Sequence, residues 1–588
     1  MTLFVSLLIS FITVRGFRFT ITENGLTMQN TLSFIWLPIL LFLVRVLSLS
    51  MKEKNSRLKI YAALFAIITG GCFIAGAGME KMKGISWIWR DPDVPVNVLN
   101  LFFSHAVLYY CAAFSGFKYL GQDHRAAAET GIFSFRRVLI YWFILLILYL
   151  PWYMHFYPGI VTQDTADQIN DAITLDGIRD HHSAFLTLMM RLVILPLRNM
   201  TGSLQNGVAA TTLLQMLIVT FIFSLTCVWI RKYLTNTLSR VFVFLWYAIF
   251  PVNNIYSVTL WKDVMFSVCF LALLLCLDAA AEDEENYFSG RIKRLALLLT
   301  LALLPLMRHN GILISAAMCI FLPLRFRHHR RQTGLICCGA LLVFGLWKLL
   351  VLPALHVTEI PAGQALSVLE QQMARAMNVH HEELSPEEMK EFTRYFDIED
   401  LWTRYKPEIS DPVKRHFRDD LYRADPAGFF SSWAKLGRRY PVDYFEALLA
   451  NNYGYWFPET HYWVVSSGVD AGKWDIEDVH AAPLFSSGVL TKVFDYISGD
   501  QFLKIPLLPL LFSRGACFWI WIFCGCFCLF DNRKKFILFL CGLSLWTGIL
   551  ISPVYNEYRY VYGLFIGLPL MMVSALGRRE PDIGDHSR

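Results

Sequence analysis

Long apolar stretches separated by short polar ones recur along the entire chain. Each extends over about 13 to 24 residues, which in helical form spans most or all of the roughly 30 Å hydrocarbon core of a bilayer. The pattern predicts an all-α polytopic membrane protein with about fourteen transmembrane helices. We expect them at residues 2–14, 32–49, 60–79, 98–117, 138–155, 208–230, 241–258, 264–281, 295–307, 312–324, 335–353, 507–530, 536–553 and 560–577.

The first apolar stretch has two interpretations, a cleaved signal peptide or a retained helix. Residues 2–14 lack a basic start, and no small-residue cleavage site precedes Arg15. We therefore expect a retained helix.

The composition excludes an ordinary soluble protein. Of 588 residues, 55% are hydrophobic and only 17% are charged, too few to cover the surface of one globular domain. The net charge of +6 is small and lies mostly in loops, so it does not indicate a nucleic-acid partner. All 13 cysteines fall within the apolar stretches, which predicts neither a disulfide framework nor a zinc site.

Basic residues cluster in short polar segments, and these set the expected orientation of the chain. Short loops rich in Lys and Arg stay in the cytoplasm. The basic segments are 52–59, 118–137, 231–240, 291–294, 325–331 and 533–535, and Arg578–Arg579 follows the last apolar stretch. We expect a multi-pass plasma-membrane protein with a cytoplasmic C-terminus. The segments midway between the basic ones are expected on the outer face, namely 156–207, 253–263, 308–311, 356–504 and 556–559.

The spacing of the apolar stretches divides the chain into four parts. They are N-terminal transmembrane helices at 1–137, a transmembrane core with an outer loop at 138–353, an extracytoplasmic soluble domain at 354–505, and C-terminal transmembrane helices at 506–588. The soluble domain is expected to be mainly helical. Its strongest local pattern is Ser385–Pro386–Glu387–Glu388, a capping box that predicts a helix over 389–395.

The first outer loop carries the most informative polar pattern. Tyr157–Pro158–Gly159 turns the chain as it leaves the membrane, so the following residues lie back against the helix ends. Asp164, Asp167 and Asp171 follow at helical spacing, so one helix face can carry all three carboxylates. A carboxylate there can accept a proton from a hydroxyl while a phosphate ester leaves. The alternative is an ordinary solvated acidic helix.

Paired histidines follow in the same outer segment. His181 and His182 are candidates for proton transfer, phosphate binding or metal binding, although loop histidines more commonly have none of these roles.

Two further outer segments place charge at helix ends. Lys262–Asp263 begins an apolar stretch, where Asp263 suits the helix dipole and Lys262 opposes it, so a bound phosphate would explain the lysine. A lysine that extends to the membrane interface explains it equally well. Arg308–His309 interrupts two short apolar stretches, which membranes tolerate where such residues line a cavity.

The remaining candidates lie in the last outer turn and in the soluble domain. Glu557 and Arg559 can pair with each other, or Arg559 can hold a phosphate with two parallel hydrogen bonds. Gln371, Gln372 and Arg375 lie close together in the soluble domain, which also contains an aromatic run at 452–458. Amides and aromatic faces suit sugar binding, and they suit packing on the membrane surface as well.

Six motifs in fixed order carry a resemblance to a known group of proteins. The motifs are YPG(x)4D(x)3Q, HH, LWKD, RHNG, QQxAR and ExRY. Over about residues 138–577 the chain resembles a bacterial family of uncharacterised polytopic membrane proteins. That family looks like a branch of the GT-C type glycosyltransferases. One position departs from the pattern, since Ser183 stands where proline is expected after the paired histidines.

The resemblance implies a fold and an activity. It implies a GT-C-like membrane core that takes a sugar from a polyprenyl-phosphate-linked donor and passes it to an extracytoplasmic glycan, lipid or protein acceptor. In such enzymes an acidic residue of the first outer loop is the catalytic base, which maps onto Asp164, with Asp167 as the second choice. Basic residues at outer helix ends hold the lipid-linked phosphate, which maps onto Lys262, Arg308 and Arg559.

Two other functions fit the same outer residues. A non-enzymatic transporter or flippase of lipid-linked sugars would use the basic groups only to bind a headgroup, and it would carry charge deep within several spans. A glycan ligase or polymerase would share the site and use another acceptor. Carboxylates beside a phosphate can bind Mg²⁺ or Mn²⁺, but no ligand set stands out, so no metal site is predicted.

Overall fold

The computed structural model describes residues 1–28, 36–89, 91–121, 133–174, 178–234, 236–358, 360–460, 462–464, 476, 479–484, 488–551 and 554–577. Within these ranges the chain is helical almost throughout, and its only sheet is a two-stranded antiparallel hairpin near the N-terminus. The prediction of a helical, multi-pass membrane protein is confirmed at this level.

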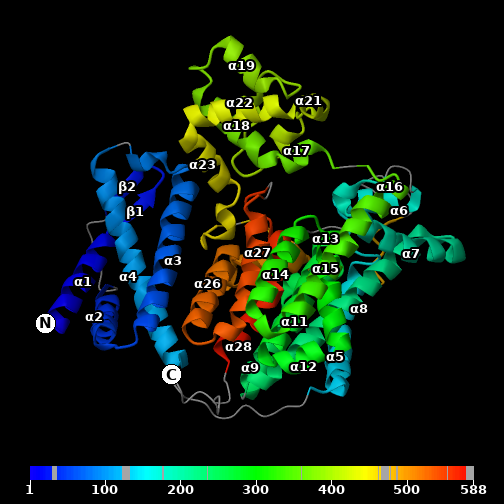
Figure 1. Ribbon diagram of the computed structural model, residues 1–588, viewed down its shortest axis with the longest axis horizontal. Coiled ribbons are helices and arrows are strands. Elements are labelled where there is room, and N and C mark those ends of the chain that lie inside the picture. Colours follow the sequence, from blue (N-terminus) through cyan, green and yellow to red (C-terminus); the bar gives the residue numbers. More distant parts are fainter. Residues whose placement is uncertain are drawn as a thin grey trace.

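The N-terminal helices form a unit beside the main bundle (Figure 1). Its elements are α1 (Thr2–Gly16), β1 (Phe19–Thr22), β2 (Gly25–Met28), α2 (Trp36–Lys52), α3 (Ser56–Met82) and α4 (Asp93–Gly121). The Asn55 side chain caps α3 by accepting a hydrogen bond from the Leu58 backbone. α3 packs along α4 on one side and contacts α26 on the other, which joins the unit to the bundle.

The central bundle contains the most deeply buried helices. Its elements are α5 (Phe135–His155), α6 (Gln163–Thr174), η2 (Asp180–His182), α7 (Ala184–Thr201), α8 (Leu204–Ile230), η3 (Arg231–Tyr233), α9 (Thr237–Ile249), α10 (Pro251–Ser257), α11 (Lys262–Glu282), α12 (Glu284–Ser289), α13 (Arg291–Met307), α14 (Gly311–Arg325), η4 (Arg327–His329), α15 (Arg330–Leu346), η5 (Trp347–Val351) and α16 (Leu352–Ala354). α11 is apolar on nearly all sides and contacts α8, α13, α27 and α28. A helix of that composition needs apolar surroundings, and most residues of α11 are buried among its neighbours.

The C-terminal helices complete this bundle. They are α24 (Gly488–Ser498), α25 (Leu508–Leu511), α26 (Arg514–Phe530), α27 (Phe536–Ile549) and α28 (Tyr558–Leu576). α28 packs on α11 and α26, so the last outer turn of the chain comes to lie above the helix that begins with Lys262.

A separate helical body lies at one end of the bundle (Figure 1). It consists of α17 (Ala362–Ala365), α18 (Ser367–His380), α19 (Pro386–Thr393), η6 (Leu401–Arg404), α20 (Asp411–Lys414), α21 (Asp419–Ala424), α22 (Pro426–Arg439) and α23 (Pro441–Ala450). These helices share a hydrophobic core of their own. The capping box at Ser385 and Glu388 is confirmed, with both reciprocal hydrogen bonds formed at the start of α19.

The body accounts for only part of the predicted 354–505 domain. η7 (Tyr453–Tyr455) and α24 pack against the membrane helices and share their cores, instead of joining the core of the body. The aromatic run at 452–458 therefore connects the body to the bundle.

The expected number of fourteen spans is not confirmed. Among the described residues, eight helices are long and apolar enough to cross a membrane, and a ninth span results if α9 and α10, bent by 43°, count as one. α1, α14 and α26 are apolar but have only 10–17 residues, and of these only α26 is shorter than the apolar stretch expected for it. α7 also meets the criterion by length and composition, although it was not expected. Its Arg191 donates to the carbonyl groups of Ala172 and Ile173.

The end of the bundle opposite the helical body is closed by a buried ion cluster. Lys535 donates to both Asp278 and Glu282, at 2.8 and 2.6 Å. Tyr233 donates to the same two carboxylates, and Trp229 donates to Asp278. Every charge in this cluster has a partner, which is the condition for burying charge within a membrane protein.

A buried carboxylate ties the helical body to the N-terminal unit. Glu446 of α23 accepts hydrogen bonds from the backbone nitrogens of Ile85 and Ser86, both at 2.6 Å, and it pairs with Arg375 of α18. Its side chain is 1% exposed. The carboxylate thus joins α18, α23 and the outer loop of the N-terminal unit.

We predict that Glu446→Gln destabilises the protein by about 3 kcal/mol, because it leaves the Arg375 charge buried without its main partner. The measurement is thermal unfolding of the purified protein in detergent, followed by intrinsic fluorescence. Glu391→Gln is the matched control, since Glu391 pairs with Lys435 while both side chains are largely exposed. An unchanged midpoint in Glu446→Gln would contradict the connecting role.

Candidate functional site

The loop between α5 and α6 is folded back onto the loop that precedes α11. Ile160 pairs with the segment around Thr259 in parallel fashion, through Ile160 N to Val258 O at 2.8 Å and Leu260 N to Ile160 O at 3.3 Å. Gly159 permits the approach, because its φ is +139° and an added Cβ would lie 2.3 Å from the Thr212 hydroxyl.

Side chains fix the start of α6 against the same segment. The Thr165 hydroxyl donates to Leu260 O at 2.9 Å, and Trp261 Nε1 donates to the Thr162 hydroxyl at 2.7 Å. The Gln215 amide donates to three carbonyl groups of the 256–259 turn from α8. These bonds place Asp164, in the first turn of α6, beside the start of α11.

The start of α11 supplies a lysine and an aspartate to this region. Lys262 Nζ donates to the His181 carbonyl at 2.6 Å, which orients the ammonium group toward the loop of the paired histidines. Asp263, which is 2% exposed, forms an ion pair with Arg308 at 2.8 Å. The guanidinium of Arg308 also lies over the Tyr560 ring at 4.3 Å.

The last outer turn adds an arginine between two carboxyl groups. Arg559 Nη1 donates to Asp164 Oδ2 at 2.7 Å, and its Nε lies 3.7 Å from Glu557 Oε1. Burial alone would raise the pKa of Asp164, and the charges of Arg559 and Lys262 more than offset it, so the pKa falls to about 2. Burial raises the pKa of Glu557 to about 7 against the opposing charge of Arg559.

These six residues form what we call the outer charge cluster: Asp164, Lys262, Asp263, Arg308, Glu557 and Arg559. Three carboxyl groups face three basic groups within it. The side chain of Asp164 is the most open of the three carboxyl groups, at 41% exposure. Asp164 is therefore the member that a ligand reaches most readily.

The histidines border the cluster in neutral form. Burial and the nearby charge of Lys262 lower the pKa of His181 to about 4 and that of His182 to about 3. His309 Nε2 lies 2.6 Å from the Asp180 carbonyl, and burial lowers its pKa as well. Neutral imidazoles can position a ligand by hydrogen bonding, but they add no positive charge for a phosphate.

Two recesses meet at the Arg308–Asp263 pair. A small recess with a largely polar lining lies on the Asp263 side. Its lining residues are Asp164, Thr165, Gln168, His182, Leu260, Trp261, Lys262 and Asp263. A second small recess, largely apolar, lies on the Arg308 side, lined by Phe266, Arg308, Asn310, Ile314, Leu545, Gly548, Ile549 and Tyr560.

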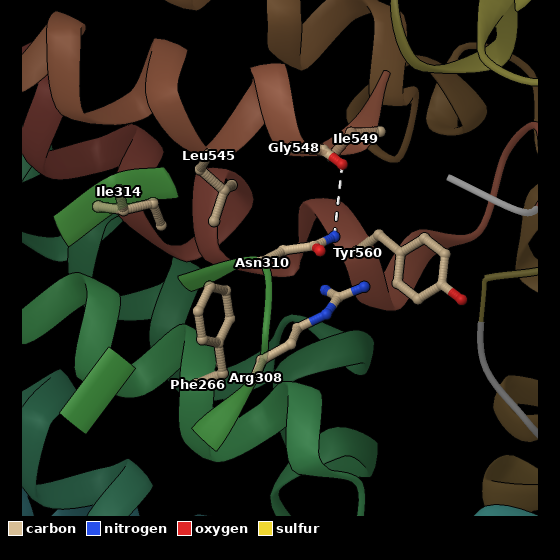
Figure 2. Close-up of a pocket in the computed structure, with 8 residues that line it drawn as sticks. All are labelled: Phe266, Arg308, Asn310, Ile314, Leu545, Gly548, Ile549 and Tyr560. Carbon is tan, nitrogen blue, oxygen red and sulfur yellow. Dashed lines mark hydrogen bonds between the residues drawn. The ribbon is translucent and has the colours of Figure 1, made fainter. Parts of the chain in front are cut away.

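Figure 2 shows how Arg308 enters the apolar recess. Phe266, Ile314, Leu545 and Ile549 provide its walls, from α11, α14 and α27, while the Arg308 guanidinium points toward the Tyr560 ring. A hydrogen bond of 3.4 Å between Asn310 and the Gly548 carbonyl joins the two sides of the recess. The recess thus combines an apolar wall with one positive charge.

Several buried polar atoms around the cluster have no hydrogen bond within the described part of the chain. They are Glu557 Oε1 and Arg559 Nε within the cluster and His182 Nδ1 beside it. Buried polar atoms in proteins are nearly always hydrogen-bonded, and each exception needs an explanation. A polar ligand bound among these atoms would supply one.

Two groups of sequence-predicted residues lie elsewhere. Asp167 turns away from the outer charge cluster and lies 3.5 Å from Arg179 and 3.7 Å from His182. Gln371 and Gln372 donate to carbonyl groups inside the helical body, and Arg375 pairs with Glu446 as described above. Gln371, Gln372 and Arg375 thus make contacts that join the helices of the body.

Arg514 is a neighbour of the cluster that sequence reasoning missed. It begins α26 within the predicted span 507–530, where it donates to the carbonyl groups of Tyr462 and Trp463 and lies over the Tyr558 ring. An arginine within an apolar stretch is rare enough to mark a functional region, and this pattern was available in the sequence.

A divalent cation does not fit this donor set well. The described residues contain no group of three or more Asp, Glu, His or Cys side chains arranged to hold a metal ion. Asp164 and Asp263 are each paired with an arginine, and a cation would have to displace both.

Comparison with known proteins gives a family and no activity. A family model described as a family of unknown function, DUF6020, matches residues 175–588. The match includes five residues of the outer charge cluster and begins after Asp164. No curated protein and no solved structure matches the chain.

Ser183 occupies the position where the motif pattern has proline, and the backbone there explains the difference. Its φ is +67°, which a proline ring cannot adopt. Its hydroxyl accepts from the Leu186 backbone as the cap of α7 and donates to Leu306 O at 2.7 Å.

We predict that Ser183→Pro destabilises the protein by about 3 kcal/mol or more, because proline fixes φ near −65°. Ser183→Ala is the control that removes only the hydroxyl contacts, and it should cost about 1 kcal/mol. Thermal unfolding of the two variants in detergent measures both effects. Equal midpoints for Ser183→Pro and Ser183→Ala would contradict the backbone argument.

Proposed function

Because the chain belongs to the DUF6020 family, whose description gives no activity, we propose a function from the geometry of the outer charge cluster. The protein is a GT-C type membrane glycosyltransferase. It transfers a sugar from a polyprenyl-phosphate-linked donor to an extracytoplasmic acceptor, at a site on the outer face of the plasma membrane.

The observation that carries the proposal is the meeting of two unlike recesses at Arg308. A lipid-linked phosphate has an apolar chain, an anionic group and a polar sugar in that order. The apolar recess suits the part of the chain next to the phosphate, Arg308 and Lys262 suit the phosphate itself, and the polar lining beside Asp164 suits the sugar. A soluble sugar nucleotide would need no apolar recess, and the sequence contains no Gly-rich phosphate loop.

Asp164 is the catalytic base in this account. It accepts the proton of the acceptor hydroxyl while the acceptor oxygen bonds to the anomeric carbon of the sugar. The bond between that carbon and the donor phosphate oxygen breaks, and its electron pair leaves with the phosphate. Attack from the face opposite the leaving group inverts the anomeric centre.

The basic residues stabilise the leaving phosphate. Negative charge grows on it as the bond breaks, and preorganised cations at low dielectric lower the energy of that state. Lys262, Arg308 and Arg559 come from α11, the α13–α14 turn and α28, so three separate elements converge on one position. No step requires a metal ion, in keeping with the donor set.

We predict that Asp164→Asn lowers sugar transfer by about 10²- to 10⁴-fold while donor binding is retained, because the amide cannot accept the proton. The measurement is transfer of radiolabelled sugar by the purified protein in lipid, from a panel of polyprenyl-phosphate donors, with donor binding recorded in parallel. Asp167→Asn tests the second candidate base, and Asp495→Asn is the control, since Asp495 lies in α24 with 67% exposure.

The outcomes separate the competing functions. Equal transfer by wild type and Asp164→Asn would remove Asp164 from the mechanism, and a loss confined to Asp167→Asn would assign the base to Asp167. Donor binding without transfer by any variant would favour a transporter or flippase. Transfer only to a glycan chain already linked to lipid would favour a ligase or polymerase.

A further inference from the structure

Arg559 lies between two carboxyl groups and is bonded to only one of them. Its Nη1 hydrogen-bonds Asp164 Oδ2 at 2.7 Å, whereas its Nε lies 3.7 Å from Glu557 Oε1. Within the described chain, neither Arg559 Nε nor Glu557 Oε1 has a hydrogen bond, and both atoms are buried. A movement of about 1 Å would convert the longer contact into a hydrogen bond.

The backbone holds Glu557 in place for such a contact. The Tyr455 hydroxyl accepts from Glu557 N at 2.8 Å and donates to Val554 O at 2.7 Å, so it braces the turn on both sides. The Glu557 side chain is 6% exposed. The carboxyl group therefore lies beside Arg559 with little freedom to turn toward solvent.

The charged and titratable groups around Glu557 come from every neighbouring element. They are Arg559 and Tyr560 on α28, Arg514 on α26, Asp263 on α11, Asp164 on α6, Tyr256 on α10, Tyr455 in η7, and Tyr462. Burial raises the pKa of Glu557 to about 7, opposed by Arg559 and Arg514 and reinforced by Asp263 and Asp164. Glu557 is consequently neutral below about pH 7 and ionised above it.

The hydrogen bond from Arg559 makes Asp164 a weak base, and Glu557 can weaken that bond. With Arg559 bound to it, Asp164 has a pKa of about 2 and little tendency to take a proton from a hydroxyl. Asp164 becomes a stronger base when Arg559 turns away. The arginine cannot be left without a partner at this depth, so another anion must receive it.

We propose that Glu557 is a positioning residue that competes with Asp164 for Arg559 and, when ionised, draws the guanidinium away so that Asp164 can accept a proton. The inference rests on the proposed function for the base role of Asp164. Glu557 releases its proton to water, its carboxylate hydrogen-bonds Arg559 Nε, and the freed Asp164 carboxylate faces the acceptor hydroxyl. Arg559 remains close enough for its charge to act on the leaving phosphate.

The competition itself can be tested without any transfer reaction. Infrared difference spectra across a pH titration record the C=O stretch of a protonated carboxyl group. In the wild type we expect a band that disappears around pH 7 and is absent from Glu557→Gln. In Asp164→Asn, Arg559 loses its stronger partner and turns to Glu557, so the midpoint should fall by about one pH unit or more.

Glu370→Gln is the matched control for these spectra. Glu370 is a buried carboxyl group of the helical body whose oxygens have no hydrogen bond among the described residues, and burial raises its pKa well above the ordinary value. Its removal should leave the transition near pH 7 unchanged. An unchanged midpoint in Asp164→Asn, or no transition assignable to Glu557, would overturn the proposal.

The consequence for catalysis is a distinct pH profile. In the wild type, transfer should rise around pH 7 as Glu557 ionises, and Glu557→Gln should lack this rise and remain at the low-pH level. Glu557→Asp should restore a rise because it keeps an ionisable group. The same rise in Glu557→Gln would overturn the positioning role. Absence of transfer by the wild type at every pH would refute the proposed function. The infrared midpoints test the competition of Glu557 and Asp164 for Arg559 independently of transfer.

Discussion

Charges near the lipid must find partners within the protein, because hydrocarbon offers none, and this constraint organises both ends of the bundle. At the end opposite the helical body, Lys535 is surrounded by acceptors, and the cluster is closed. At the other end, Arg559 bonds Asp164 across 395 positions of sequence, and its Nε lies 3.7 Å from Glu557 Oε1 without a hydrogen bond. The Lys535 charges are therefore bonded to their partners, whereas one contact of the outer charge cluster remains to be made.

The outer charge cluster depends on backbone contacts that hold no charge themselves. The pairing of Ile160 with the segment around Thr259 brings α6 to the start of α11, and Gln215 braces the turn from α8. Tyr455 braces the last outer turn from the other side. The aromatic run 452–458 therefore contributes to the site by supporting it, through packing between the helical body and the bundle.

The gathering of the polar segments at one end of the bundle could be predicted from the sequence, because basic loops alternate with the other polar segments along the chain. Asp164, Lys262, Arg308 and Arg559 lie together as this alternation predicts. The pairing among them could not be predicted, since an ion pair between α6 and α28 leaves no local spacing in the sequence. For the same reason Asp167 and Asp164 were indistinguishable, although only Asp164 contacts Arg559.

Two expectations depend on three-dimensional contacts that the sequence does not show. The expected fourteen spans are not confirmed, and the 43° bend between α9 and α10 is one place where an apolar stretch does not form a single straight helix. Gln371, Gln372 and Arg375 resemble ligand-binding residues in sequence, and the structure gives them buried polar contacts that join the helices of the body. A ligand-binding role for them stays a prediction. Arg514 was overlooked because the surrounding residues are apolar.

The central claim is that the outer charge cluster binds a lipid-linked phosphate. An electron cryo-microscopy structure of the protein in lipid with a polyprenyl phosphate tests it most directly. The account predicts phosphate density within hydrogen-bonding distance of Lys262, Arg308 and Arg559, with the lipid chain in the recess lined by Phe266 and Ile314. Phosphate density bound elsewhere on the protein, with the cluster unchanged, would contradict it.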